Sequence, residues 1–444
     1  MSDHDTPGLR SGLSCVPRYW MVLMMVLAGI ASGCRQQEPI APPATIAPTS
    51  ADSGAPADST GAKASTTGSE TLPSPAVDTA TSAENEALDA RRAAFLRHLV
   101  AEVIVPGYTA FATASRRFFD AAGKVCADSS ADSLDAAQAQ WRDAMAAWQG
   151  IGWLRLGPVR AQHRGNRILA WPGASGPIVA ERIGQALART EGAAIDEAWI
   201  ARQPVHVQGL QALEWLLFSP DSPVFDGNPT ADSARSDRAR HCELLVAIAA
   251  NLRTNANLLE AAWSDPSKRD LTGRGLLALR EKSIADVFNA VANEIMRLQN
   301  DLRHQKLGLP LGLPRKGSAQ LGPPAPFPGE SNWSHRSLDN LRINLEVIER
   351  VMGAVGEPGL DSLLRAAGHS RLSDQWRALL AEVNDGLAIA QAERALVDIQ
   401  QDSTEAVAAL RRSHGAMAQA DELYQKVIMA AMGARAVFNF NDGD

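Results

Sequence analysis

Residues 206–220 read "HVQGLQALEWLLFSP" and place a carboxylate, Glu214, inside a strongly apolar run. At helical spacing, leucines form one buried arc of this segment, and Gln211 and Glu214 lie on a second arc beside it. Few positions of this helix are left to face water. Burial of an ionised carboxylate without a partner costs several kcal/mol, so Glu214 must be paired, protonated or holding a ligand. The segment therefore predicts a buried helix with a polar site on one side.

Two explanations of Glu214 stay open at this point. It is either a ligand-binding group in a cleft or the structural partner of an arginine from the preceding loop, for which the sequence offers Arg155, Arg160, Arg164 and Arg167. We favour the cleft, because Gly209 and Gln211 on the same turn suit a face that is left open. Gln211 is either a second ligand-binding group or a hydrogen-bonding residue between packed helices.

The rest of the folded chain shows the same helical periodicity, with Ala-, Leu-, Arg- and Glu-rich segments and no sustained alternation typical of strands. An all-α fold follows. The pattern predicts a first helix that stops at Pro106, a second up to about Cys126, and a third near Ser133 with a core stripe. After an irregular connection over 157–177, we expect helices over 179–192, 206–218, 231–263, 274–304, 335–355, 359–368, 372–391, 393–413 and 417–432.

The first part of the chain differs in composition. Residues 1–33 read as a lipoprotein signal peptide, because a short apolar stretch ends in Ala-Ser-Gly directly before Cys34. This junction predicts a lipid on Cys34 and hence attachment to a membrane. Residues 34–82 are rich in Ala, Pro, Ser and Thr and predict a disordered tether.

Charge and cysteine content exclude some functions. The 444 residues carry a formal net charge of -7 and no basic tract, which argues against nucleic acid as a partner. Cys126 and Cys242 are the cysteines left for the folded part, and we favour buried free thiols over a disulfide. The chain also lacks the HExxH and GxSxG motifs of common hydrolases, so we expect no appreciable peptidase activity.

Several motifs resemble the imelysin-like family, also called the M75 peptidase or iron-regulated protein A type. They are "GLQALEWLLF", "AWQGIGWLRLGPV", "RILAWPG", "SNWSHRSLDNLRINLE" and the tail "IMAAMGARAVFNFNDGD". The resemblance implies two packed helical-bundle domains after the tether. We place the first half at 83–305, and it contains the "GLQALEWLLF" segment, called the signature segment below. A Pro- and Gly-rich connection follows at 306–334, and the second half spans 335–444.

The chain departs from the family's G-x-H-x-x-E segment because Gln211 stands where metal-binding members carry histidine. This departure is typical of a His-less subgroup of periplasmic lipoproteins. The resemblance nominates Gln211 and Glu214 as ligand-binding residues, and Glu214 also as a metal ligand, with iron or another divalent metal as the cofactor. Arg167 and Trp171, from the loop over 160–173, are further candidates for ligand binding. No residue is nominated as catalytic.

Other polar residues have two interpretations each. The loop over 160–173, with His163, is either a clamp for an anionic ligand or a solvated loop. His206 is either a metal ligand or a group at a helix start. The residues Asn439, Asn441, Asp442 and Asp444 are either oxygen ligands or a polar C-terminus.

The resemblance implies a lipid-anchored envelope protein that binds iron or another metal, or that assists metal-uptake proteins. Alternatives are a metal-dependent peptidase of the M75 type and a structural adaptor lipoprotein with a degenerate site. We expect the protein to face the periplasm. Arg35 follows Cys34, where an aspartate commonly retains lipoproteins at the inner membrane, so the outer membrane is favoured.

Overall fold

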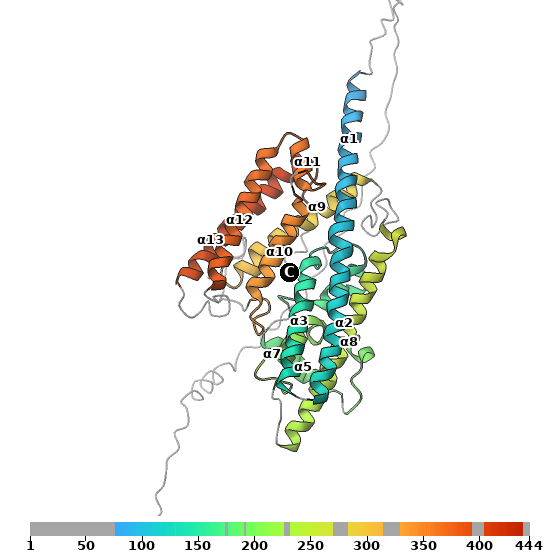
Figure 1. The fold of residues 1–444 in the computed structure, drawn as a ribbon, viewed down its shortest axis with the longest axis vertical. Coiled ribbons are helices and arrows are strands. Elements are labelled where there is room, and N and C mark those ends of the chain that lie inside the picture. The colour runs from blue at the N-terminus through green and yellow to red at the C-terminus, as the bar shows by residue number, and fades with distance from the viewer. Residues whose placement is uncertain are drawn as a thin grey trace, which may run out of the picture. The chain divides into compact units, whose positions relative to one another are not determined.

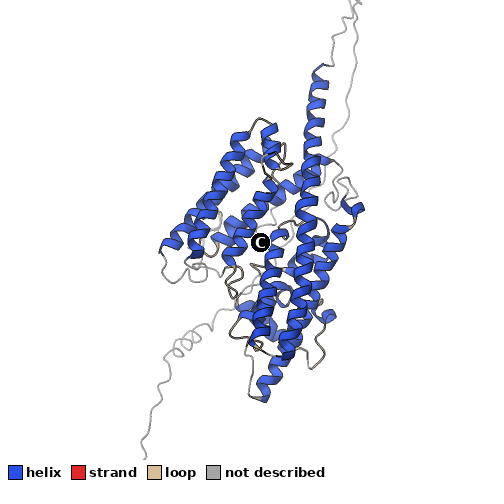
Figure 2. Ribbon diagram, in the orientation of Figure 1, coloured by secondary structure: helices blue, strands red, loops and turns tan. Residues whose placement is uncertain are grey.

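A computed structural model describes residues 76–128, 130–173, 176–190, 192–225, 231–269, 283–313, 329–354, 356–392 and 404–437, all within one compact unit, Pro73–Asp444. In these ranges every regular element is a helix and none is a strand (Figure 1 and Figure 2). The expected all-α fold is confirmed. The predicted signal peptide, Cys34 and residues 439–444 lie outside the described ranges.

The helix that opens the fold does not stop at Pro106. Helix α1 (Ala76–His98) continues through a π-helical turn, η1 (Leu99–Ile104), into α2 (Val105–Asp128). Proline removes a hydrogen-bond donor and its ring crowds the preceding turn, which normally ends a helix. Here a wider π-helical turn ends at Ile104, two residues before Pro106, and the helix continues through the proline.

Helices α2, α3 (Ala131–Ile151) and α8 (Asp232–Ser264) pack side by side and form the first helical group. The Ser130 side chain caps α3 by accepting the backbone N–H of Ser133. The predicted core stripe of α3 is confirmed, because Ala137, Trp141, Met145 and Trp148 are buried. Tyr108 of α2 stacks on Trp263 of α8 in the same core.

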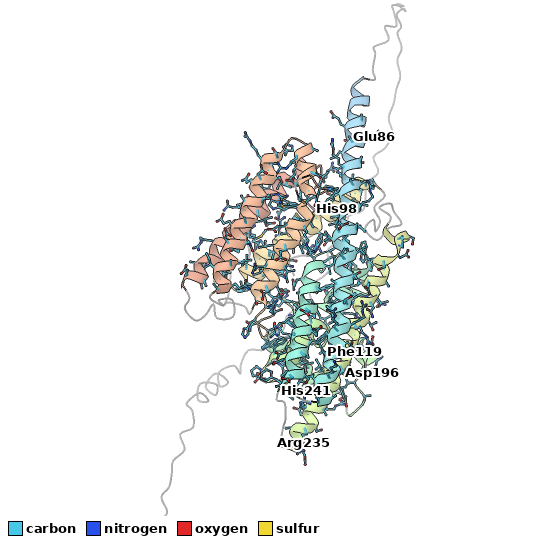
Figure 3. The ribbon with its side chains drawn as sticks, viewed as in Figure 1. Glu86, His98, Phe119, Asp196, Arg235 and His241 are labelled. Carbon is cyan, nitrogen blue, oxygen red and sulfur yellow. A yellow bond between two sulfur atoms is a disulfide. The ribbon has the colours of Figure 1, made fainter. Side chains whose placement is uncertain are left out.

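A disulfide joins two helices of this group. Cys126 near the end of α2 is bonded to Cys242 of α8, with 5.5 Å between the two Cα atoms. The expectation of free thiols is therefore wrong. The sequence separation of 116 residues concealed the pair, whereas the side-by-side packing of α2 and α8 brings the cysteines within bonding range. Figure 3 labels His241, the neighbour of Cys242.

Between α3 and α8 the chain forms short helical elements, and two of them lie within residues 157–177, where an irregular connection was expected. They are η2 (Gly157–His163), α4 (Arg164–Ile168), α5 (Pro177–Ala188), α6 (Glu197–Ile200), η3 (Val205–Val207) and α7 (Gly209–Phe218). Helix α7 carries the signature segment, and every residue from Gly209 to Leu217 is buried. The buried helix expected there is confirmed, beginning three residues later than expected.

The remaining elements are η4 (Pro266–Arg269), α9 (Ile284–Asn300), η5 (Asp301–Gly308), α10 (Ser337–Met352), α11 (Leu360–Ala366), α12 (Ser370–Ala392), α13 (Thr404–Leu423), η6 (Tyr424–Ile428) and α14 (Met429–Ala431). Helices α9 to α13 form a second helical group (Figure 1), in which α12 packs along α13. The expected break between 413 and 417 is absent, because the helix runs through Gly415, a residue that a helix interior tolerates at a modest cost.

Several contacts join the groups. Helix α10 packs on α3 and on η1, and α9 and α11 pack on α1, which continues through η1 into α2. Helix α9 and η5 also contact α13 within the second group.

The division of the chain at residue 306 stays a prediction, since residues 314–328 of the connection lie outside the described ranges. No described helix is both long and apolar enough to cross a bilayer.

Candidate functional site

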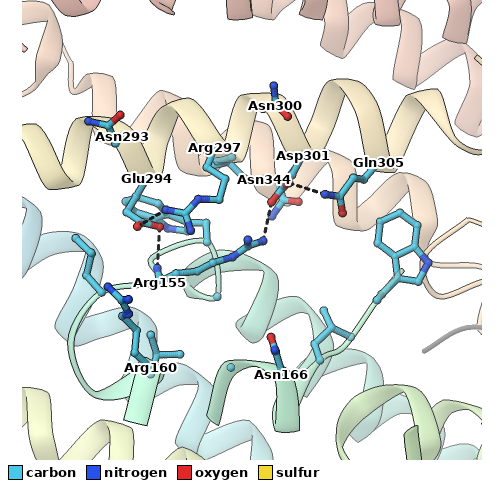
Figure 4. A pocket seen from close by; sticks show the side chains of 18 of the residues that line it. Arg155, Arg160, Asn166, Asn293, Glu294, Arg297, Asn300, Asp301, Gln305 and Asn344 are labelled. Carbon is cyan, nitrogen blue, oxygen red and sulfur yellow. Dashed lines mark hydrogen bonds and ion pairs between the residues drawn. The ribbon is translucent and has the colours of Figure 1, made fainter. Parts of the chain in front are cut away.

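A cavity of about 1230 Å³ lies between the loop that follows α3 and the helix formed by α9 and η5 (Figure 4). Its polar lining includes Arg155, Arg160, His163, Asn166, His206, Asp286, Asn289, Asn293, Glu294, Arg297, Asn300, Asp301, Gln305, Lys306, Glu330 and Asn344. A cavity of this size and polarity accommodates a ligand much larger than a single ion.

An ion pair and a hydrogen bond cross the cavity. A guanidinium nitrogen of Arg155 lies 2.7 Å from a carboxylate oxygen of Asp301, and the backbone N–H of Arg155 donates to Glu294 at 3.0 Å. Arg297 pairs with the other oxygen of Glu294. Burial raises the pKa of Glu294 and the Arg297 charge opposes it. These bonds attach the loop after α3 to the second helical group.

The π-helical segment η5 supplies much of one wall. Asp301, Gln305 and Lys306 all come from it and line the cavity. The Lys306 ammonium donates to Gln149 of α3 at 2.7 Å, to Glu330 at 2.9 Å and to Asn344 of α10 at 2.6 Å. Sequence reasoning missed these residues, because a lysine in a helical pattern carries no sign that three separate elements converge on it.

Glu214 is held by the neutral residue Ser334. One oxygen accepts hydrogen bonds from the backbone N–H of Ser334 at 2.9 Å and from its hydroxyl at 2.8 Å. Within the described ranges, it forms no ion pair with an arginine and is not among the cavity-lining residues. Burial raises the pKa of Glu214 to about 7, against the hydrogen bonds from Ser334, and Glu330 adds to the rise.

A buried polar network leads from this turn to the cavity wall. The side chain of Asn340 donates to Ser331 at 3.0 Å and to the carboxylate of Glu330 at 3.1 Å. Glu330 in turn pairs with Lys306. Glu214 therefore fixes the segment over 330–336, and this segment places a cavity-lining carboxylate.

Gly209 is needed for close packing at the start of α7. It has a φ of +67°, and a Cβ atom added to it would lie 2.3 Å from the carbonyl oxygen of Ile168 and 2.4 Å from that of Arg167. An open face, which we expected at this turn, is thus absent. The contact places the C-terminal end of α4 directly against the signature helix.

The pair Gln211 and Glu214 does not fit a bare metal ion. The side-chain oxygen of Gln211 is buried and has no hydrogen-bond partner, so it could accept one donor. A first-row metal ion needs three or more protein ligands, and the described part of the chain has no group of three His, Cys, Asp or Glu residues placed to hold one. Whether either residue binds a ligand stays a prediction.

The other nominated residues fall in two places. Trp171 lines the cavity, whereas Arg167 is outside its lining and donates to the carbonyl oxygen of Ala201 at 3.0 Å. His163 and His206 both line the cavity. The structure thus brings Trp171 and the two histidines together and keeps Gln211, Glu214 and Arg167 behind the wall.

The last described residues run along α9 beside the cavity. The backbone N–H of Arg435 donates to the side chain of Asn289 at 2.6 Å, and that of Val437 donates to Asn293 at 2.8 Å. Asn293 also donates to the carbonyl oxygen of Arg435 at 3.0 Å. Two asparagines one helical turn apart thereby hold an extended backbone, and Val437 reaches the cavity lining.

Comparison with known proteins identifies one family and several similar solved structures. The family model described as imelysin, peptidase M75, matches residues 104–426. An imelysin-like protein from Psychrobacter arcticum 273-4 has a TM-score of 0.61 and 19% identity, over 79% of this chain and 98% of that one. A putative iron-regulated protein A precursor from Parabacteroides distasonis ATCC 8503 has a TM-score of 0.54 and 15% identity, over 76% and 95%. No curated protein matches.

Proposed function

The chain belongs to the imelysin family, and we propose from this premise that it is a lipid-anchored envelope protein that binds a metal complex in the uptake of iron or another metal. The observation that carries the proposal is the polar cavity of about 1230 Å³. Its volume is about forty times the volume that one molecule occupies in liquid water, which suits a chelated metal rather than a bare ion. The name of the Parabacteroides protein supports the link with iron.

Binding is favoured over hydrolysis by the way the cavity is built. Its acidic side chains are engaged by arginine, lysine or a helix-capping serine, and none is left as a free general base among the described residues. Glu214, the carboxylate of the signature segment, is engaged by Ser334 outside the cavity. A hydrolytic role would need an activated water, which these groups are not arranged to hold.

Titration of the full-length protein in detergent tests the proposal. We expect ferric complexes of citrate or of a hydroxamate chelator to bind, and ferrous, ferric and zinc ions alone to bind more weakly. Asn166 is exposed and lines the cavity, so Asn166→Trp should obstruct entry and abolish binding. The control Gln375→Trp, at an exposed site on α12, should bind as wild type does.

Two results would contradict the proposal. One is the absence of binding for every complex in the wild-type protein. The other is equal binding by Asn166→Trp, which would move the site out of the cavity. Turnover of denatured casein that depends on added metal would instead support the peptidase alternative.

We expect the mature protein to begin at a diacylated Cys34 and to face the periplasm from the outer membrane. The Ala-Ser-Gly-Cys junction and Arg35 support this expectation. Intact mass spectrometry of the membrane-extracted protein should show the acyl mass on Cys34, and Cys34→Ala should release a folded protein from the membrane fraction. A wild-type protein without acyl mass would refute the anchor.

A further inference from the structure

The acidic side chains of the cavity are already engaged. Ser283 donates a hydrogen bond to Asp286, and Arg297 pairs with Glu294. Arg155 pairs with Asp301, and Lys306 pairs with Glu330. An incoming cation would have to displace a protein donor from any of these four carboxylates. The acidic part of the lining therefore serves the architecture rather than a cationic ligand.

The segment on the opposite wall is basic, and its arginines are not paired with acidic residues. Arg160, Arg164 and Arg167 lie within eight residues, and none of them forms an ion pair with any residue that the structure describes. Arg164 donates to the carbonyl oxygen of Pro158 at 2.7 Å and to the Asn255 side chain at 3.2 Å, both neutral acceptors. Burial lowers the pKa of Arg164, and the nearby Arg167 charge lowers it further. The segment over 160–167 therefore carries positive charge that no described acidic residue pairs with, and Arg160 brings part of this charge into the cavity lining.

The backbone of the same loop is strained. Gln162 and His163 are consecutive residues with φ of 55° and 54°, in the left-handed region that side chains other than glycine rarely adopt. Each such residue costs roughly 1–2 kcal/mol. The buried Arg164, through its two hydrogen bonds, holds the loop in this conformation. Strain that the surrounding structure maintains is typical of a site that presents particular side chains.

The side chains presented are Arg160 and His163. Both are exposed and both line the cavity. In Figure 4, Arg160 and Asn166 lie across the cavity from Asn293, Glu294 and Asp301 of the α9 and η5 wall. Arg160 has no hydrogen-bond or ion-pair partner among the described residues, so its guanidinium is available to a ligand.

We propose that Arg160 and His163 form a subsite for an oxyanionic group, a carboxylate or a phosphate, of the molecule that enters the cavity. A guanidinium binds such groups through two parallel hydrogen bonds, and the imidazole adds a further donor. The cavity is far larger than an inorganic anion, so the anion is one group of a larger ligand. The inference rests on the proposed function and specifies that the bound metal complex carries negative charge.

Calorimetric titration of the full-length protein in detergent tests the subsite. The probes are citrate, ferric citrate, inorganic phosphate and an uncharged ferric trihydroxamate. We expect citrate and ferric citrate to bind the wild-type protein and to lose about tenfold or more in affinity in Arg160→Gln. Arg160→Lys, which keeps the charge, should retain part of the affinity. The control Arg412→Gln changes an exposed arginine of α13 and should have no effect.

The uncharged trihydroxamate separates this inference from the proposed function. If it binds and citrate binding ignores Arg160→Gln, the oxyanion subsite is wrong and the proposed function stands. If citrate binds through Arg160, and neither ferric citrate nor the ferric trihydroxamate binds more tightly than citrate does, the subsite stands and the proposed function fails. No binding of citrate or phosphate to wild type also overturns the subsite. Displacement of citrate by phosphate would support a general oxyanion subsite, and its failure a carboxylate subsite.

Discussion

Replacement of both cysteines, Cys126→Ala with Cys242→Ala, should lower the free energy of unfolding by about 4 kcal/mol. The disulfide closes a loop of 116 residues, and loss of a cross-link over about 100 residues releases roughly 4.7 kcal/mol of chain entropy into the unfolded state. Denaturant melts of the full-length protein measure the effect. Treatment of the wild type with a phosphine reductant should give a similar loss.

The double variant also serves as the control for the reductant, because its stability should not respond to reduction. Thiol titration of unfolded wild type should find Cys126 and Cys242 unreactive until reductant is added. Two free thiols in the native protein, together with melts that are indifferent to reductant, would show that the cross-link does not form. The expected bond also agrees with an oxidising compartment such as the periplasm.

Glu214→Gln should remove a pH dependence of stability on the order of 3 kcal/mol. Burial raises the pKa of Glu214 from its ordinary value of 4.5 to about 7, so the native state holds this proton more tightly than the unfolded chain does. The stabilisation is present in full below about pH 4.5 and is lost as the pH rises through about 7. Glutamine keeps an oxygen for the two Ser334 donors and does not titrate.

The variant should therefore be more stable than the wild type at pH 8 and should converge with it, or fall below it, at pH 4.5. Melts of both proteins over this range give the difference curve, which isolates Glu214 from other titrating groups. Glu346→Gln, at an exposed site of α10, should leave the wild-type pH dependence unchanged. Parallel curves for Glu214→Gln and wild type would show that Glu214 is ionised in the native protein. A loss of several kcal/mol at pH 8 would indicate a cationic partner.

The sequence predicted the helices well, because they rest on local periodicity. The stripe through Trp141 and the buried segment at 209–217 both follow from apolar residues at helical spacing. The ends of the helices were harder to predict than their positions. Pro106 and Gly415 usually end or weaken helices, yet the tertiary packing of α2 and α13 carries both residues within continuous helices.

The site was harder to predict, because it depends on residues far apart in the chain. The apolar setting of Glu214 correctly indicated a buried carboxylate that needs a partner, but the partner, Ser334, lies 120 residues further on. A hydroxyl and a backbone N–H leave no mark in the sequence pattern. Nothing in the sequence marked Lys306, and Arg155 was considered only as a partner of Glu214, whereas the packing of the two helical groups places both in the lining of one cavity.

The asparagine pair that holds the last described backbone has a practical consequence for optical measurements. Val437 is 52% exposed, lies in the cavity lining and is fixed to α9 by Asn293. A small fluorophore on a cysteine introduced there would sit on a rigid support at the entrance, without disturbing the ion pairs inside. Quenching of its emission by a paramagnetic ferric complex would report occupancy in real time.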